Sequence, residues 1–146
     1  MSKTLDDLFD LWAEDSKIDR TELGEESIKI PQLHSKYYKL YSTERLKSVK
    51  LQEDLKILKK DLFEYYSGTM SLEELQDHKW EQNPLKILKS DISMHIDSHQ
   101  EVIEMNLKVA YAKEKVDFLE SVVRTLNLRS YQINNAINWE KFKVGI

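Results

Sequence analysis

The sequence predicts an all-α protein built from long helices. Only three glycines and two prolines occur in 146 residues, and a third of the residues are charged. The apolar residues recur at spacings of three and four, which is typical of amphipathic helices and not of strands. The few glycines and prolines fall between these periodic segments, so they mark where the expected helices begin and end.

The first expected helix runs from Thr4 to about Asp15. Thr4 suits the N-cap position, and Asp7 follows three residues later, where a capping box places its acidic member. One side of this helix is apolar and carries Leu5, Leu8, Phe9 and Trp12.

The segment 16–30 is ambiguous, because it contains Gly24, although Asp19 and Glu22 are placed to cap another turn. Pro31 then suits the first turn of a long helix, where a missing backbone N–H costs little.

This long helix carries an apolar seam with heptad-like spacing of four, three, four and three. Its residues are Leu51, Leu55, Leu58, Leu62 and Tyr65. The remaining faces are cationic and carry Arg45, Lys47, Lys50, Lys56, Lys59 and Lys60. One helix is therefore expected to bury a seam and to present a basic flank, and to end at Ser67-Gly68.

A connector with a short helix follows, in which Ser71 and Glu74 match a capping box and Asn83-Pro84 marks a turn. From Pro84 to about Asn127 no helix breaker occurs. A continuous helix of that length would extend about 66 Å, so it must bend or pack against other subunits.

The last segment, 128–145, is expected to be a partly amphipathic helix that docks on its own core or on a neighbouring subunit. The chain length fits a single domain. Its parts are an N-terminal helical region at 1–68, a connector at 69–90, and a long helix with a C-terminal helix at 91–146.

Charge is segregated along the chain. Residues 1–30 have a net charge of −5 and residues 61–105 of −7, whereas residues 31–60 carry 8 basic and 3 acidic side chains, a net charge of +5. Since salt screens charges beyond about 8 Å, this local block matters more to a polyanion than the total of −4. The block is a candidate phosphate-binding surface, and the alternative is a solvated helix face with internal ion pairs.

Several function classes lack support in the sequence. The chain has no cysteine, which excludes disulfides and thiolate chemistry and fits a reducing cytoplasm. No segment approaches the roughly 20 apolar residues of a membrane span, so we expect a soluble protein without an export signal. No nucleophile motif or phosphate-binding glycine loop occurs, and we expect neither an enzyme nor a cofactor.

Asp91, His95 and His99 have the i, i+4, i+8 spacing that places three possible ligands on one helical face. No other ligand is specified, so we expect no metal site. A hydrolase or metalloenzyme that uses the two histidines remains the least favoured alternative.

Tyrosines interleave with the basic block, a composition typical of proteins that bind single strands through a cationic groove and stacking rings. They are Tyr37, Tyr38, Tyr41, Tyr65 and Tyr66. Tyr65 lies on the apolar seam and is expected in the core, whereas Tyr66 is the better candidate for stacking on a base.

Two stretches, LKKDLFEYYSG at 58–68 and RTLNLRSYQINNAINWEKFKVG at 124–145, resemble the UvsY recombination mediators of T4-like phages. The resemblance covers most of the chain and is weakest at 1–30 and 69–90. It implies an all-helical fold, ring-shaped homo-oligomers assembled through C-terminal helices, and non-specific binding of single-stranded DNA in the cytoplasm of an infected bacterium. It also implies contacts with the phage recombinase and the phage single-strand-binding protein, which the recombinase replaces on DNA.

The resemblance also implies site residues. The family's basic pair before Tyr-Tyr-Ser-Gly falls on Lys60 and Leu62, so one basic residue is missing, and Lys59 is its possible substitute. With two further basic positions and the stacking tyrosine, the expected DNA-binding residues are Lys50, Lys56, Lys59, Lys60 and Tyr66. The expected assembly residues are Tyr131, Ile133, Ile137 and Phe142.

The main alternative is a helical oligomeric scaffold or adaptor that has no affinity for DNA. Such a protein would assemble normally after charge reversal at Lys59 and Lys60. The acidic residues 1–30 could also form an arm that shields the basic helix.

Overall fold

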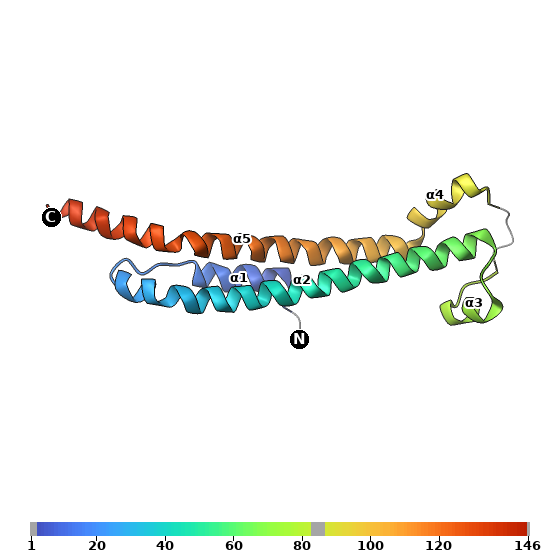
Figure 1. Cartoon of the computed structure of the whole chain (residues 1–146), viewed down its shortest axis with the longest axis horizontal. Coiled ribbons are helices and arrows are strands. Elements are labelled where there is room, and N and C mark those ends of the chain that lie inside the picture. The colour runs from blue at the N-terminus through green and yellow to red at the C-terminus, as the bar shows by residue number, and fades with distance from the viewer. Residues whose placement is uncertain (1–2, 83–86, 146) are drawn as a thin grey trace. The chain divides into compact units, whose positions relative to one another are not determined.

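The computed structural model describes residues 3–82 and 87–145. The chain forms two compact units, which we treat separately: unit 1 comprises residues 1–46 and 112–146, and unit 2 comprises residues 47–111. The helices, in chain order (Figure 1), are α1 (Leu5–Asp15), α2 (Leu23–Ser67), α3 (Leu72–His78), the 3-10 helix η1 (Lys89–Asp91), α4 (Ile92–Asp97) and α5 (Gln100–Lys143). No strand occurs in these two ranges, and the predicted all-α class is confirmed.

Helix α1 begins as the sequence predicts. The Asp7 backbone N–H donates to the Thr4 hydroxyl over 3.1 Å, and the Thr4 N–H donates to the Asp7 carboxylate over 3.0 Å. These two hydrogen bonds form a capping box, and they lower the pKa of Asp7.

Helix α2 begins eight residues earlier than predicted, at Leu23, and Pro31 lies inside it. The Asp19 carboxylate accepts hydrogen bonds from the N–H and hydroxyl of Thr21, which fixes the turn just before the helix. Gly24 lies in the first turn, and Glu25 and Glu26 add favourable charge there. This short-range polar turn, and not the proline, sets the start of the helix.

The end of α2 matches the prediction. The helix ends at Ser67, and Gly68 takes a φ of 79°, a left-handed conformation that glycine adopts at no steric cost. Helix α3 then begins after Ser71, whose hydroxyl accepts from the Glu74 N–H over 3.2 Å. The predicted turn at Asn83-Pro84 lies outside the described residues.

The long helix predicted from Pro84 to Asn127 is interrupted. Helix α4 ends at Asp97, where the Ser98 hydroxyl donates to the carbonyl of Met94 over 2.9 Å. The His99 Nδ1 then accepts from the Glu101 N–H over 3.1 Å, which satisfies an amide at the start of α5. Helix α5 continues unbroken to Lys143, so residues 128–143 are its last part and the predicted separate helix at 128–145 does not form.

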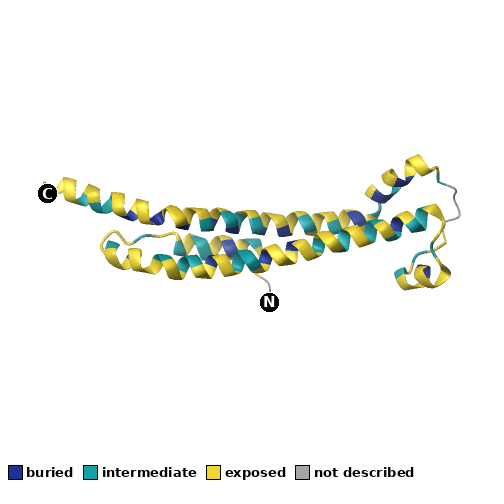
Figure 2. Ribbon diagram, in the orientation of Figure 1, coloured by how far each residue is buried: buried dark blue, intermediate teal, exposed yellow. Residues whose placement is uncertain are grey.

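The core of unit 1 lies where α1 packs on the first part of α2 and the second part of α5 (Figure 2). Its buried residues are Leu8, Tyr37, Leu119, Val122 and Leu126. Leu11, Trp12, Leu33, Leu40, Tyr41, Phe118 and Val123 pack around them.

Polar contacts from α5 hold α1 in place. The buried guanidinium of Arg129 donates to the carbonyl oxygens of Asp15 (3.0 Å), Ser16 (2.8 Å) and Lys17 (3.3 Å), at the C-terminal end of α1. It also lies 5.8 Å from the centre of the Trp12 ring. The arginine therefore satisfies carbonyls that the ending helix leaves without partners.

A second buried cation, Lys115, lies on the same helix. Its ammonium group is 3.1 Å from the Glu44 carboxylate and donates to the Lys3 carbonyl over 3.2 Å. Both charged side chains are less than a tenth exposed, so neither faces solvent within unit 1.

The core of unit 2 contains four of the five residues of the predicted seam, all but Leu51. Leu62, Ile92, Ile96 and Val102 are buried, and partly buried residues pack against them: Leu55, Leu58, Tyr65, Tyr66, Trp80 and Ile87. The seam therefore stabilises the chain's own fold here. None of the helices in the described part is long and apolar enough to span a membrane.

Candidate nucleic-acid-binding surface

The part of α2 in unit 2 has a second stripe, displaced by two residues from the buried seam. Two residues correspond to about 200° around a helix, so this stripe lies roughly opposite the seam. Its residues are Val49, Glu53, Lys56, Lys60 and Phe63, all of them exposed, and we call them the outer stripe.

The side chains of Lys56 and Lys60 on the outer stripe form only weak, exposed ion pairs. The Lys56 ammonium lies 3.0 Å from Glu53, and that of Lys60 lies 3.8 Å from Glu64. Both lysine side chains are about three-quarters exposed, at 73% and 75%. Exposed pairs of this kind contribute only about 0.3–0.5 kcal/mol, so phosphate groups can compete for these ammonium groups.

The two other predicted lysines flank the outer stripe. Lys50 follows Val49 directly, and it is exposed and 3.1 Å from Asp54. Lys59 precedes Lys60, points about 100° away from it towards the seam, and is half-buried. The four lysines thus lie on a broad arc of α2, on which Lys56 and Lys60 share a line.

Leu62 is fully buried in the core of unit 2. The position at which the resemblance implies a basic residue therefore faces the seam, where an arginine would have no access to a phosphate.

The Tyr66 ring is engaged within the protein. It is half-buried, with its ring centre 5.2 Å from that of Tyr65 and 5.5 Å from that of His95. Burial raises its pKa, and the nearby Tyr65 adds to this effect. Its contact with DNA stays a prediction. Tyr37 is fully buried, which removes it from the candidates for stacking.

The possible metal ligands do not share one helix. Asp91 lies in η1, His95 in α4 and His99 in the break before α5. The described ranges contain no group of three side chains arranged to hold a metal ion.

The third histidine of unit 2, His78, contacts residues of the protein's own fold. The His78 Nε2 lies 3.2 Å from the Asp61 carboxylate, and its ring stacks on Trp80 at a centre-to-centre distance of 4.1 Å. Trp80 in turn contacts the rings of Tyr65 and His99. These contacts hold α3 against the end of α2.

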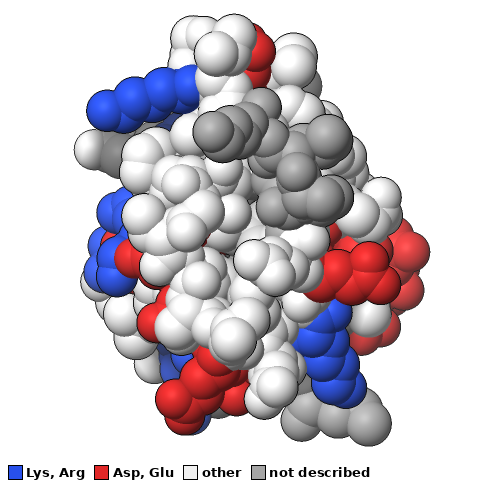
Figure 3. All heavy atoms as spheres, turned by 90° about the vertical axis from the view of Figure 1, so that its right-hand side faces the viewer, with Lys and Arg blue, Asp and Glu red and all other residues white. Residues whose placement is uncertain are grey.

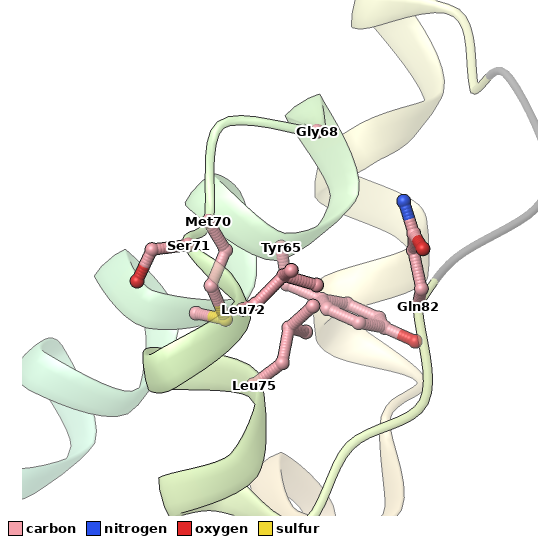
Figure 4. Close-up of a pocket in the computed structure, with 7 residues that line it drawn as sticks. All are labelled: Tyr65, Gly68, Met70, Ser71, Leu72, Leu75 and Gln82. Atoms are coloured by element: carbon pink, nitrogen blue, oxygen red, sulfur yellow. The ribbon is translucent and has the colours of Figure 1, made fainter.

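A cleft of about 420 Å³ lies beside this aromatic cluster (Figure 4). Tyr65 from α2 and Leu75 from α3 face each other across it, and the Tyr65 hydroxyl donates to the carbonyl of Glu81. The full lining is Tyr65, Gly68, Met70, Ser71, Leu72, Leu75 and Gln82. No carboxylate, imidazole or amine lines this cleft among the described residues, so it offers no acid–base pair.

Seen end-on (Figure 3), the molecule presents uncharged atoms in the middle of the view, and acidic groups gather at the right and lower edges. Basic groups lie at the left edge and at the lower right, and in both places acidic groups lie beside them.

The predicted assembly residues differ in exposure. Tyr131 and Phe142 are exposed by 67% and 72%, and Phe142 stacks on Trp139 at 5.5 Å. Ile137 is half-buried, whereas Ile133 is buried within its own chain. Ile133 is therefore part of the core of its own chain. Of the four predicted residues, Tyr131 and Phe142 are the ones exposed enough to contact another subunit.

Sequence reasoning missed Phe63. This ring is 46% exposed and lies one turn beyond Lys60 on the outer stripe. The sequence could have placed it, because each residue of the outer stripe lies two positions before a residue of the seam, and Phe63 lies two positions before Tyr65.

Comparison with known proteins agrees with this architecture. The family model described as "Recombination, repair and ssDNA binding protein UvsY" matches residues 11–146. The recombination protein uvsY of Enterobacteria phage T4 is 22% identical over 141 residues, which cover 97% of this chain and 98% of the relative.

Crystal structures of the bacteriophage T4 recombination mediator protein UvsY share the fold. In lattice type II the TM-score is 0.84 at 20% identity, with 97% of this chain and 98% of that chain covered. In lattice type IV the TM-score is 0.83 at 19% identity, with 96% and 99% covered. Because the family model spans nearly the whole chain, the protein belongs to the UvsY family of recombination, repair and single-stranded-DNA-binding proteins.

Proposed function

We propose that this protein is a recombination mediator that binds single-stranded DNA without sequence preference. It helps the phage recombinase to replace the single-strand-binding protein on that DNA. The observation that carries the proposal is the pair of exposed, loosely held lysines on the outer stripe, in a member of this family. Phosphate contacts dominate non-specific affinity, and flexible exposed ammonium groups are suited to them.

The proposed function does not include a chemical reaction. Displacing one protein from DNA and admitting another requires binding energy and geometry, and we propose neither a catalytic residue nor a cofactor. The site of action that we propose is the cytoplasm of the infected bacterial host.

Assembly is part of the proposal. We propose a ring-shaped homo-oligomer, joined through the C-terminal part of α5, in which copies of the outer stripe act together on one strand. Several weak sites on one assembly bind a long strand far more tightly than one site does, because later contacts form at high effective concentration.

The deciding experiment measures fluorescence anisotropy of a labelled oligothymidine titrated with protein over a salt series. We expect salt-sensitive binding, preferred over duplex DNA, that weakens at least about 10-fold in the double variant Lys56→Glu/Lys60→Glu. The matched control is Lys108→Glu/Lys113→Glu, which changes the total charge equally on exposed positions of α5 and is expected to keep most of the affinity.

A wild-type protein that binds no oligothymidine even at low salt contradicts the proposal. That outcome favours the second candidate, a helical scaffold without DNA affinity, to which the exposed apolar residues of α5 would give a contact surface. Equal losses in the two double variants would also count against the outer stripe as the binding surface.

A further inference from the structure

Phe63 is an exposed aromatic ring on the line of the two outer-stripe lysines. It lies three residues after Lys60 and seven after Lys56, so the three side chains occupy successive turns of one face of α2. Its ring is 46% exposed, and in the described part of the chain no other ring lies against it. The fold therefore gives this ring no aromatic partner of its own.

We propose that Phe63 is a DNA-contacting residue on which a base of the bound single strand stacks, while Lys56 and Lys60 bind the phosphates of the same strand. This inference rests on the proposed function. Binding of single strands combines a cationic track for the backbone with an aromatic face for the bases, and any base has a face to offer.

The tyrosines of the same region do not meet the same conditions. Tyr66 is half-buried and already contacts Tyr65 and His95, and Tyr65 packs against the core of unit 2. Stacking on either ring would require these contacts to be broken. Phe63 needs no such rearrangement, because its exposed face is already on the surface.

The pattern of the outer stripe favours a strand of DNA over a partner helix. A helix that pairs through this stripe would need apolar residues at most of its five positions. Here the central three are Glu53, Lys56 and Lys60, and only the two ends, Val49 and Phe63, are apolar. Lysine is depleted in the centres of protein interfaces, whereas it is the residue that a phosphate chain requires.

The test compares Phe63→Leu with Phe63→Trp. Leucine keeps an apolar side chain and removes the aromatic face, and tryptophan keeps and enlarges that face. We expect Phe63→Leu to bind oligothymidine about 10-fold more weakly than wild type and Phe63→Trp to bind at least as tightly. The indole emission of Phe63→Trp should also be quenched by the oligonucleotide beyond any change in the wild-type protein.

An abasic oligonucleotide of equal length isolates the stacking contribution, because it has the phosphates and lacks the bases. Wild type and Phe63→Leu are expected to bind this strand equally. As a matched control, Leu107→Ala removes an exposed apolar side chain from α5 and is expected to leave the affinity for both strands unchanged.

Three results would overturn the inference. If Phe63→Leu binds oligothymidine like wild type, no base stacks on Phe63, and the mediator proposal still stands. If affinity falls equally for abasic and normal strands, and sedimentation shows lost assembly, the ring is a contact between proteins. If wild type binds neither strand, the proposed function fails together with the inference.

Discussion

At the residue scale, the Tyr37 hydroxyl and the Asp15 carboxylate form a partly buried pair in unit 1. The hydroxyl donates to the carboxylate over 2.7 Å, and Lys36 binds the same oxygen over 2.6 Å. Burial, followed by the hydrogen bond to Asp15, raises the pKa of Tyr37. Burial alone would raise the pKa of Asp15, but the bonds from Lys36 and Tyr37 together lower it.

These shifts predict a pH dependence of the free energy of unfolding. Since folding raises the pKa of Tyr37, its contribution is complete below the unfolded value of about 10 and is lost as the pH rises further. Tyr37→Phe is expected to destabilise the protein by about 2 kcal/mol at pH 7 and to show a smaller alkaline loss than wild type. Urea unfolding of the wild type and the variant between pH 7 and pH 11 measures the destabilisation at pH 7 and the loss of stability at alkaline pH.

At acid pH the free energy of unfolding changes in the opposite direction, because it falls as the pH is lowered. The depressed pKa of Asp15 gives a contribution present above about 3.8 and lost as the pH falls through the folded value. Because the Tyr37→Phe substitution removes one of the two donors to this carboxylate, the variant should lose less stability than wild type in acid. A variant whose pH profile runs parallel to that of wild type throughout would contradict this account.

Single residues also show how far the sequence could specify the site. The heptad pattern correctly placed Leu62 in the seam. The basic residue that the family resemblance implies at this position would have to lie in the core. The exposure of Lys56 and Lys60 followed from the same pattern. The burial of Ile133 and the engagement of Tyr66 did not, because they depend on contacts with residues distant along the chain or in other helices.

At the scale of elements, α1 depends on a single side chain of α5 at its C-terminal end. Arg129 donates to three successive carbonyls there, and the geometry of its planar guanidinium allows several donors to act at once. A lysine at this position has one ammonium group and cannot reach all three oxygens in the same way.

We therefore expect Arg129→Lys to lower the free energy of unfolding by about 2 kcal/mol and to increase hydrogen exchange of the α1 amides. Arg124→Lys is the matched control, because Arg124 is exposed and pairs with Glu120 on its own helix, and its effect should stay within about 0.5 kcal/mol. Equal effects of the two changes would mean that the buried guanidinium does not hold α1.

The helix boundaries show which local signals the sequence contains. The cap at Thr4 and the glycine end at Gly68 were predicted, since both act through neighbouring residues of known type. The start of α2 was not predicted, because Pro31 suits a first helical turn and so predicts a later start, whereas the helix begins after the polar turn at Asp19. The break at Ser98 was missed because a serine and a histidine end helices less regularly than glycine or proline do.

At the scale of the whole molecule, large apolar side chains remain exposed near the end of α5. Tyr131, Trp139 and Phe142 are each more than half exposed. Clustered exposed aromatic residues mark surfaces that contact other proteins. We expect them to belong to the interface between copies in the proposed ring.

The corresponding prediction is that Tyr131→Asp/Phe142→Asp reduces assembly while the protein stays folded, since neither side chain is buried. Sedimentation velocity measures the assembly state, and circular dichroism confirms the helices. Leu88→Asp/Leu107→Asp is the control, with the same charge change at exposed positions of unit 2. Unchanged sedimentation of the first variant would exclude these two residues from the interface.

The division into two units had no mark in the sequence. Its limits fall within α2 and α5, near Leu46 and Ala112, where the chain contains neither glycine nor proline. Helix-forming residues continue through both limits, so composition alone shows one uninterrupted region. The division reflects tertiary contacts, which local patterns do not encode.

The contacts of Arg129 and Lys115 have a consequence for the order of events during protein synthesis. They bind carbonyls of residues 15–17 and 3, more than 110 positions earlier in the chain. Unit 2 is a continuous stretch that leaves the ribosome before either cation does. The nascent α1 can pack on the first part of α2 early, because Tyr37 and Leu40 follow it closely in the chain. Its contacts with α5 must wait until the last third of the chain emerges and closes a loop of that length.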